Sequence, residues 1–177
     1  MSVSDLDLAQ RAKDGDRGAF RHLLERHYDT FYRVAYRFFG NRAEAEDVAQ
    51  EIAMALADRI GSFRGESRLS TWLYRVALNA CRDHARRQQG FRALQGNYMA
   101  FADHRDADWA DSEDKVKWLY QALDGLDPAL KETALLVLTE YMSHAQAGEV
   151  LGIAESTVSW RMHEAKKRLK KMAKDDA

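Results

Sequence analysis

The chain has 177 residues, a formal net charge of −1 and one cysteine, Cys81. A single cysteine excludes an internal disulfide and a cysteine-rich zinc site, and no apolar stretch reaches the length of a bilayer span. One proline in a chain rich in Ala, Leu, Glu and Arg favours an all-α protein of one or two small domains, and an N-terminus without an apolar signal core leads us to expect a cytoplasmic protein.

Helix signals begin near the N-terminus. Ser4 is the cap of a short peripheral helix that stops at Asp14-Gly15. Apolar residues at three- and four-residue spacing then predict a core helix from Asp16 to about Phe39. Gly40 ends this helix, because glycine adopts the left-handed conformation of a helix terminus without strain.

The next helix is predicted from Asn41 to Gly61. Asn41 and Glu44 have the spacing of a capping box, which satisfies two backbone N–H groups at the start of a helix. The outer side of the helix is mostly acidic and carries Glu44, Asp47, Gln50, Glu51 and Asp58. Such a face is either a solvated surface or a docking surface for a basic groove of another protein, because complementary charges guide association.

A glycine-containing loop leads into a helix from Ser70 to about Gln89. The loop offers three side chains for exposure, Phe63, Arg64 and Arg68. On the apolar stripe of the helix lie Cys81 and His84, which we expect to be core residues because two ligands are too few for zinc. The opposite stripe combines an aromatic ring, an amide and several guanidinium groups: Trp72, Arg75, Asn79, Arg82, Asp83 and Arg86.

This stripe has the chemistry that single-stranded nucleic acid requires. Cations follow the backbone, a ring or a guanidinium plane stacks on a base, and an amide reads base edges. Removing a base from a duplex costs a few kcal/mol, and stacking on an aromatic side chain returns roughly 1–3 kcal/mol per base. The alternative is that Trp72 is a core anchor and that Arg86-Arg87 is a solvated helix end.

Residues 91–110 interrupt the helical pattern and are predicted to form a flexible acidic linker between two helical domains, residues 1–90 and 111–177. We hypothesise that the acids from Asp103 to Asp111 lie on a basic domain in the free protein and compete with nucleic acid. Deleting them would then strengthen nonspecific DNA binding at low salt.

The C-terminal domain is predicted to contain four helices. Asp111 or Ser112 is the cap of the first, and Asp127-Pro128 begins the second, since proline at the first helical position loses no needed donor. The core face of the second helix is predicted to be Leu130, Ala134, Leu135, Leu138 and Tyr141.

The last two helices have the pattern of a helix-turn-helix. Ser143 and Gln146 form a capping box, Gly148 leaves room for a crossing helix, and Gly152 forms the corner. The last helix begins between Ala154 and Ser156, and its apolar stripe is Val158, Met162, Ala165, Leu169 and Met172. Its other faces are strongly basic, which suits a DNA major groove flanked by phosphates; a solvated helical hairpin is the alternative.

Four stretches resemble the extracytoplasmic-function (ECF) branch of bacterial sigma factors: AEDVAQEIAMAL at residues 45–56, FRGESRLSTWLYRVALNACRDHARR at 63–87, LDPALKETALLVL at 126–138 and HAQAGEVLGIAESTVSWRMHEAKKRL at 144–169. The resemblance covers nearly the whole chain, and the second stretch is its most specific part. It implies a region 2-like domain at residues 1–90, a region 4-like domain at 111–177, and an alternative sigma factor that directs core RNA polymerase to promoters and helps to melt the minus-10 element.

The resemblance also implies partners and site residues. The partners are the clamp helices and flap of the largest polymerase subunits, promoter DNA and an anti-sigma factor. The implied polymerase contacts are Asp47, Gln50 and Glu51. The implied minus-10 contacts are Phe63, Arg64, Arg68, Trp72, Arg75, Asn79, Arg82 and Arg86. The implied minus-35 contacts are Ser156, Ser159, Trp160, Arg161, His163 and Lys167.

Several positions depart from the family pattern. Ser159, Trp160 and Glu164 stand where the family usually has Arg, Ser and Arg, Ala154 holds the capping position, and Gly148 replaces the usual Ala. These departures leave the fold intact but weaken any promoter sequence inferred from relatives. Trp160 either contacts a thymine methyl or packs on the partner helix, and Glu164 either repels a phosphate or accepts from a cytosine amino group.

Other functions fit the sequence less well. A sigma-like decoy that titrates an anti-sigma factor typically carries an attached receiver domain, which we do not find here, and it would leave the arginine-rich helix without a use. A dimeric repressor would need a ligand pocket or a dimer helix. Because the sequence contains no phosphate-binding loop, acid pair or nucleophile motif, we expect no catalysis and no cofactor.

Overall fold

The computed structural model describes residues 3–94 and 114–175, which form helices and turns without a strand in those ranges. The predicted all-α class is therefore confirmed for the described residues. The chain divides into two compact units, residues 1–104 and 105–177. Within these described ranges, no helix is both long and apolar enough to cross a bilayer.

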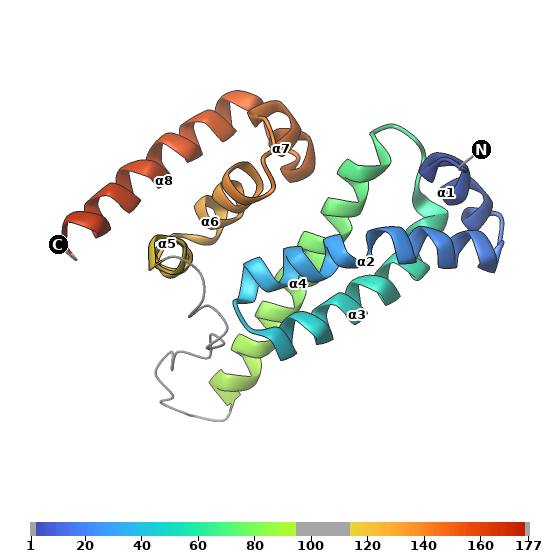
Figure 1. The fold of residues 1–177 in the computed structure, drawn as a ribbon, viewed down its shortest axis with the longest axis horizontal. Helices are drawn as coiled ribbons and strands as arrows, with labels where there is room; N and C mark the ends of the chain where they lie inside the picture. The colour runs from blue at the N-terminus through green and yellow to red at the C-terminus, as the bar shows by residue number, and fades with distance from the viewer. Residues whose placement is uncertain (1–2, 95–113, 176–177) are drawn as a thin grey trace. The chain divides into compact units, whose positions relative to one another are not determined.

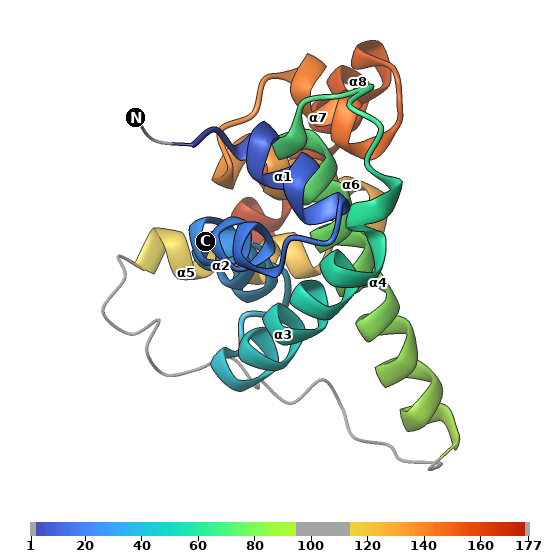
Figure 2. The same cartoon turned by 90° about the vertical axis from the view of Figure 1, so that its right-hand side faces the viewer.

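Unit 1 consists of α1 (Asp5–Lys13), α2 (Arg17–Phe39), α3 (Arg42–Arg59), the short 3-10 helix η1 (Ile60–Ser62) and α4 (Leu69–Leu94). Helices α2, α3 and α4 pack on one another, and α1 packs on α2 (Figures 1 and 2). Their shared core contains the apolar stripes that helical spacing predicts. Its buried side chains include Leu23, Phe31 and Val34 of α2, Val48, Ile52 and Leu56 of α3, and Leu73, Val76 and Cys81 of α4.

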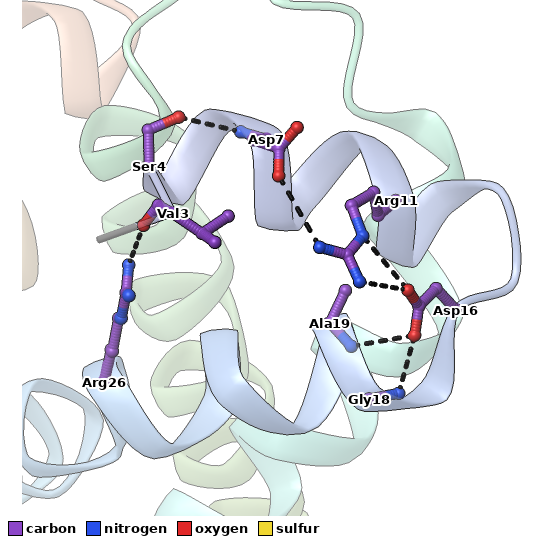
Figure 3. A network of polar contacts seen from close by, with 8 residues as sticks. All are labelled: Val3, Ser4, Asp7, Arg11, Asp16, Gly18, Ala19 and Arg26. Carbon is purple, nitrogen blue, oxygen red and sulfur yellow. Dashed lines mark hydrogen bonds and ion pairs between the residues drawn. The ribbon is translucent and has the colours of Figure 1, made fainter. Parts of the chain in front are cut away.

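Capping side chains determine where α1 and α2 begin (Figure 3). Ser4 Oγ accepts a hydrogen bond from the Asp7 N–H at 3.1 Å. One carboxylate oxygen of Asp16 accepts from the N–H groups of Gly18 and Ala19 at 2.9 and 3.0 Å, and the other accepts from Arg11 Nη2 at 2.7 Å. The hydrogen bond from Ala19 is the main cause that lowers the pKa of Asp16, and Arg11 adds to it. These bonds satisfy N–H groups that have no partner inside the helix.

Helix α4 continues further than the sequence predicted. We expected it to end near Gln89 and the linker to begin at residue 91, but the helix runs to Leu94. Gly90 has no left-handed backbone, and a Cβ there would meet nothing within 4 Å, so it interrupts neither the hydrogen bonds nor the packing. The acidic part of the predicted linker, Asp103 to Asp111, and the predicted caps Asp111 and Ser112 lie outside the described residues.

Unit 2 consists of α5 (Asp114–Asp124), α6 (Pro128–Ala134), the π-helical turn η3 (Leu135–Thr139), α7 (His144–Leu151) and α8 (Glu155–Asp175). Helices α5, α6 and α7 pack on α8 (Figure 1). As predicted, Val158, Met162, Ala165 and Leu169 of α8 are buried, and Met172 is half-buried. Helix α8 is therefore the structural centre of this unit.

The predicted core position of Tyr141 is wrong. Tyr141 is 87% exposed and has a backbone φ of 55°. The helix widens at η3, where Thr139 Oγ1 donates to the Leu135 carbonyl at 2.6 Å, and it ends before residue 141. A π-helical turn contains more residues than an α-helical turn, so the 3.6-residue period that placed Tyr141 on the core face no longer applies.

Candidate nucleic-acid interfaces

One face of α4 carries the aromatic, amide and guanidinium groups that the sequence predicted. Trp72, Arg75, Asn79 and Arg82 are half-buried, and Arg86 is exposed. Because these positions recur every three or four residues, they lie on one stripe of the helix. Asn79 Oδ1 accepts from Arg82 Nη1 at 3.0 Å, which holds the amide and the guanidinium side by side. The stripe can therefore present a flat ring and adjacent N–H donors together.

Phe63 does not lie on this exposed surface. The sequence predicted an exposed aromatic ring in the loop, but Phe63 is only 7% exposed. Its ring centroid lies 5.4 Å from that of Trp72, with the planes inclined by 56°. Lys13 Nζ donates to the Phe63 carbonyl at 3.2 Å and ties the loop to α1. Phe63 thus packs against Trp72, whereas Arg64 and Arg68 are exposed as expected.

The acidic side of α3 divides into two groups of residues. Asp47, Gln50 and Asp58 are exposed, as predicted. Glu51 is half-buried and turns toward α4, where it accepts from His84 Nδ1 at 3.1 Å and from Arg87 Nη2. The expectation that Glu51 belongs to the free outer face is therefore wrong, because two donors on the neighbouring helix bind its carboxylate.

Sequence reasoning missed Met54 on the same helix. Met54 is 62% exposed and lies one helical turn after Gln50 and one before Asp58. Asp47, Gln50, Met54 and Asp58 form an exposed stripe of α3. Because it is a candidate docking surface, we name it the docking stripe of α3. Methionine adapts its shape and is enriched in protein interfaces, so an exposed Met among polar groups is a candidate apolar anchor. The four-residue spacing from Gln50 could have revealed it.

Cys81 and His84 are core residues, as the sequence predicted. Cys81 is fully buried, and His84 is 9% exposed. His84 Nδ1 faces Glu51, and His84 Nε2 lies 3.4 Å from Glu44 Oε1. The two side chains therefore belong to the packing between helices and not to the surface stripe of α4.

The helix-turn-helix of unit 2 has the predicted local structure. Ser143 and Gln146 form both hydrogen bonds of a capping box, and Gly152 has a left-handed φ of 69°. A Cβ at Gly148 would lie 2.8 Å from the Ile153 carbonyl oxygen, and 3.6 Å from Val158. Gly148 therefore makes room mainly for the backbone of the turn at Ile153, and less for the crossing helix α8.

Most of the residues of α8 that are implied to contact the minus-35 element are exposed to solvent. Ser156, Ser159, Trp160, His163 and Lys167 are exposed, and Arg161 is half-buried. Trp160 is 62% exposed, so it does not pack on the partner helix. Glu164 accepts from Arg168 at 3.3 Å, and this ion pair offsets the charge of Glu164 on the basic face.

Ser159 has less hydrogen-bonding capacity than its exposure implies. Its hydroxyl donates to the Glu155 carbonyl at 3.1 Å, and its oxygen lies 2.9 Å from His144 Nδ1. A hydroxyl has one hydrogen, so the ring nitrogen of His144 must be the donor of the second bond. In this conformation the Ser159 hydroxyl can accept a hydrogen bond from a base but cannot donate one.

Comparisons with known proteins agree with this arrangement. Residues 23–91 match the family model of sigma-70 region 2. The chain is 29% identical to the ECF RNA polymerase sigma factor SigW of Bacillus subtilis, over 94% of this chain and 95% of that protein. It is 28% identical to the ECF RNA polymerase sigma-E factor of Haemophilus influenzae, over 94% of each chain.

The chain is therefore similar in sequence to ECF RNA polymerase sigma factors.

Two solved structures resemble this chain in fold. CnrH, in complex with the cytosolic domain of CnrY, matches with a TM-score of 0.73 and 25% identity, over 98% of this chain and 99% of that chain. The sigma factor RpoE of Bartonella quintana, in complex with the anti-sigma factor NepR, matches with a TM-score of 0.69 and 23% identity, over 89% and 98% of the chains.

The region 2 match spans nearly all of the candidate surfaces of unit 1. It begins within α2, includes α3 and the loop, and ends at residue 91 of α4. The docking stripe of α3 and the stripe of α4 therefore both lie within the residues that match sigma-70 region 2.

Proposed function

We propose that this protein is a sigma factor that binds core RNA polymerase, directs it to specific promoters and holds the melted minus-10 strand open. The observation that carries the proposal is the stripe of α4, where Trp72, Asn79 and Arg82 combine a ring, an amide and a guanidinium on one helix face. Residues 1–90 are proposed as the polymerase-binding and minus-10 domain, 91–110 as the linker and 111–177 as the minus-35 domain.

Polymerase docking is assigned to the docking stripe of α3. Asp47 and Asp58 supply negative charge, and Met54 supplies an apolar side chain between them. Charge complementarity speeds association and sets register, while buried apolar anchors contribute most of the binding free energy. A basic surface with an apolar pocket, such as one on the polymerase clamp helices, has the matching chemistry.

Strand capture is assigned to the stripe of α4 and to the loop before it. Trp72 has Phe63 packed against its ring, so it has a fixed orientation before a base arrives. Stacking of one base on such a ring contributes roughly 1–3 kcal/mol, which offsets the few kcal/mol lost when the base leaves the duplex. The exposed Arg64, Arg68 and Arg86 supply cations for the strand backbone.

Recognition of the minus-35 element is assigned to α8. In a helix-turn-helix the second helix enters the major groove, and the exposed residues near its N-terminus meet base edges. We assign Trp160 to thymine methyl contact, because it is exposed and apolar, and His163 and Lys167 to the polar and phosphate contacts that surround it. The solved neighbours CnrH and RpoE each form a complex with CnrY or NepR, which supports an anti-sigma factor as a further partner here.

Transcription with purified components tests the proposal. Core RNA polymerase from the source bacterium is mixed with supercoiled genomic DNA, with and without the sigma factor, and transcript 5′ ends are mapped. We expect new start sites that depend on the wild-type protein and that disappear with Trp72→Ala or Asn79→Ala. A protein that neither binds core polymerase nor changes its start sites would contradict the proposal and instead support a decoy that titrates an anti-sigma factor.

The role of α8 has its own test at those mapped promoters. Trp160→Ala should alter base preference at the minus-35 element, whereas Lys167→Ala should weaken binding to all sequences and lower the salt slope of log K by about 0.9. The measurement is transcription from promoters with randomised minus-35 bases, together with binding at several salt concentrations. Unchanged base preference in Trp160→Ala would remove Trp160 from the reading residues.

A further inference from the structure

A polar cluster lies where α2, α3 and α4 meet, away from the stripe of α4. Its centre is His84 of α4, which is 9% exposed. His84 Nδ1 lies 3.1 Å from Glu51 Oε1, and His84 Nε2 lies 3.4 Å from Glu44 Oε1, both on α3. The edge of the His84 ring also meets Phe39 of α2, with centroids 5.3 Å apart and planes inclined by 72°.

The hydrogen bonds of this cluster can be assigned from chemistry. An ionised carboxylate only accepts, so His84 Nδ1 carries the hydrogen in its bond to Glu51. Arg87 Nη2 donates to the other oxygen of the same carboxylate. Each oxygen of Glu51 thus receives a donor from α4, and these charge-assisted bonds are stronger and more directional than bonds between neutral groups.

We propose that His84 and Arg87 are positioning residues, which hold Glu51 inward and fasten α3 to α4. Glu51 then acts as an internal clamp between the docking helix and the strand-holding helix. This inference rests on the proposed function. Asp47, Gln50 and Met54 remain exposed on the outer face of the same helix for contact with polymerase.

The clamp has a mechanical consequence. In the proposed function, polymerase binds α3, and the melted strand contacts Trp72 and Asn79 on α4. The position of α4 relative to α3 therefore determines where these two side chains lie at the promoter. A misplacement of about 1 Å is enough to cost 100-fold where groups must meet a reacting or strained partner. Loss of the clamp should therefore impair strand opening much more than polymerase affinity.

The test separates these two quantities in the full-length protein. The variants are His84→Leu, His84→Gln, Arg87→Met and Glu51→Gln, with Asp47→Asn as a docking variant and exposed Gln89→Ala as a neutral control. Affinity for core polymerase is measured by fluorescence titration, and the rate of opening is measured on a promoter mapped with the wild-type protein. Thermal unfolding identifies the temperatures at which every variant is folded.

We expect His84→Leu and Arg87→Met to bind core polymerase within twofold of wild type and to open the promoter at least tenfold more slowly. Glu51→Gln should slow opening to the same extent. His84→Gln keeps an N–H donor for Glu51 and should recover most of the rate. The double variant His84→Leu/Glu51→Gln should be no slower than either single variant, because both remove the same clamp.

Two results would overturn the clamp. Either His84→Leu and Arg87→Met open the promoter at the wild-type rate, or they weaken affinity for core polymerase as much as Asp47→Asn does. Arg87 lies near the surface, so Arg87→Met tests the idea even if a substitution at His84 prevents folding. A wild-type protein that does not bind core polymerase would overturn the proposed function itself, which is a different outcome.

Discussion

Asp5 shows how single side chains of unit 1 respond to pH. Its oxygens lie 2.7 Å from Arg26 Nη1 and 2.9 Å from His27 Nε2. The hydrogen bond from Arg26 is the main cause that lowers the pKa of Asp5; burial opposes it, and His27 adds to the lowering. A lowered folded-state pKa means that the ionised form of Asp5 stabilises the fold, by joining α1 to α2.

The pH dependence of this contribution has a definite sign. It is fully present above the unfolded pKa of about 3.9 and is lost as pH falls through the lower folded-state pKa. Asp5→Asn should lower the free energy of unfolding by about 0.5–1 kcal/mol at pH 7, because the pair is partly exposed and screened by solvent. Urea unfolding should show this gap narrowing toward pH 3; a gap that stays constant would contradict the ionic origin.

Met54 provides a test of polymerase docking at a single residue. Met54→Ser removes the apolar anchor and keeps the charges of Asp47 and Asp58. We expect affinity for core polymerase to fall by about 1–2 kcal/mol, roughly 5- to 30-fold, as for a truncated interface anchor. Fluorescence titration measures the change, and Leu6→Ser, an exposed apolar residue on α1, is the matched control. Equal affinity for both variants would remove Met54 from the interface.

Among the helices, two glycines allow opposite predictions. A Cβ at Gly148 in α7 would lie 2.8 Å from a backbone oxygen, whereas a Cβ at Gly90 in α4 would meet nothing within 4 Å. Gly148→Ala should destabilise unit 2 by about 1–3 kcal/mol through overpacking. Gly90→Ala should stabilise unit 1 by about 0.5–1 kcal/mol, because alanine has the higher helix propensity. Calorimetric unfolding of both variants checks the two signs.

Helix boundaries that depend on local chemistry were predictable from the sequence. The caps Ser4, Asn41 and Ser143 and the left-handed Gly40 and Gly152 act within a few residues of themselves, so their spacing identifies them. The π-helical turn before Tyr141 was not predicted, because the 3.6-residue period assumes a regular α-helix.

Site residues were predictable only where orientation follows from the helical period. The stripe of α4 from Trp72 to Arg86 follows from spacing alone. The inward turn of Glu51 and the burial of Phe63 depend on partners far along the chain, His84 and Trp72, that only the tertiary fold brings together. Residues that have such partners are where sequence reasoning assigned surface roles wrongly.

At the scale of the whole molecule, the chain has two helical units, to which we assign separate tasks. Unit 1 contains the docking stripe of α3 and the stripe of α4, which both lie within the residues that match sigma-70 region 2. Unit 2 presents the basic helix α8 by a tight helix-turn-helix corner. We infer that α8 positions the protein on the promoter by binding the minus-35 element, and that unit 1 binds polymerase and opens the strands. Neither unit alone would then produce specific initiation.

The most direct test of this division is permanganate footprinting, which detects unpaired thymines, at a promoter mapped with the wild-type protein. Core polymerase with the wild-type sigma factor should make thymines of the minus-10 element reactive. With Trp72→Ala, polymerase should still bind the promoter, but reactivity should fall at least about fivefold, consistent with a stacking contribution of about 1–3 kcal/mol per base. Full reactivity with Trp72→Ala/Asn79→Ala would contradict a strand-holding role for α4.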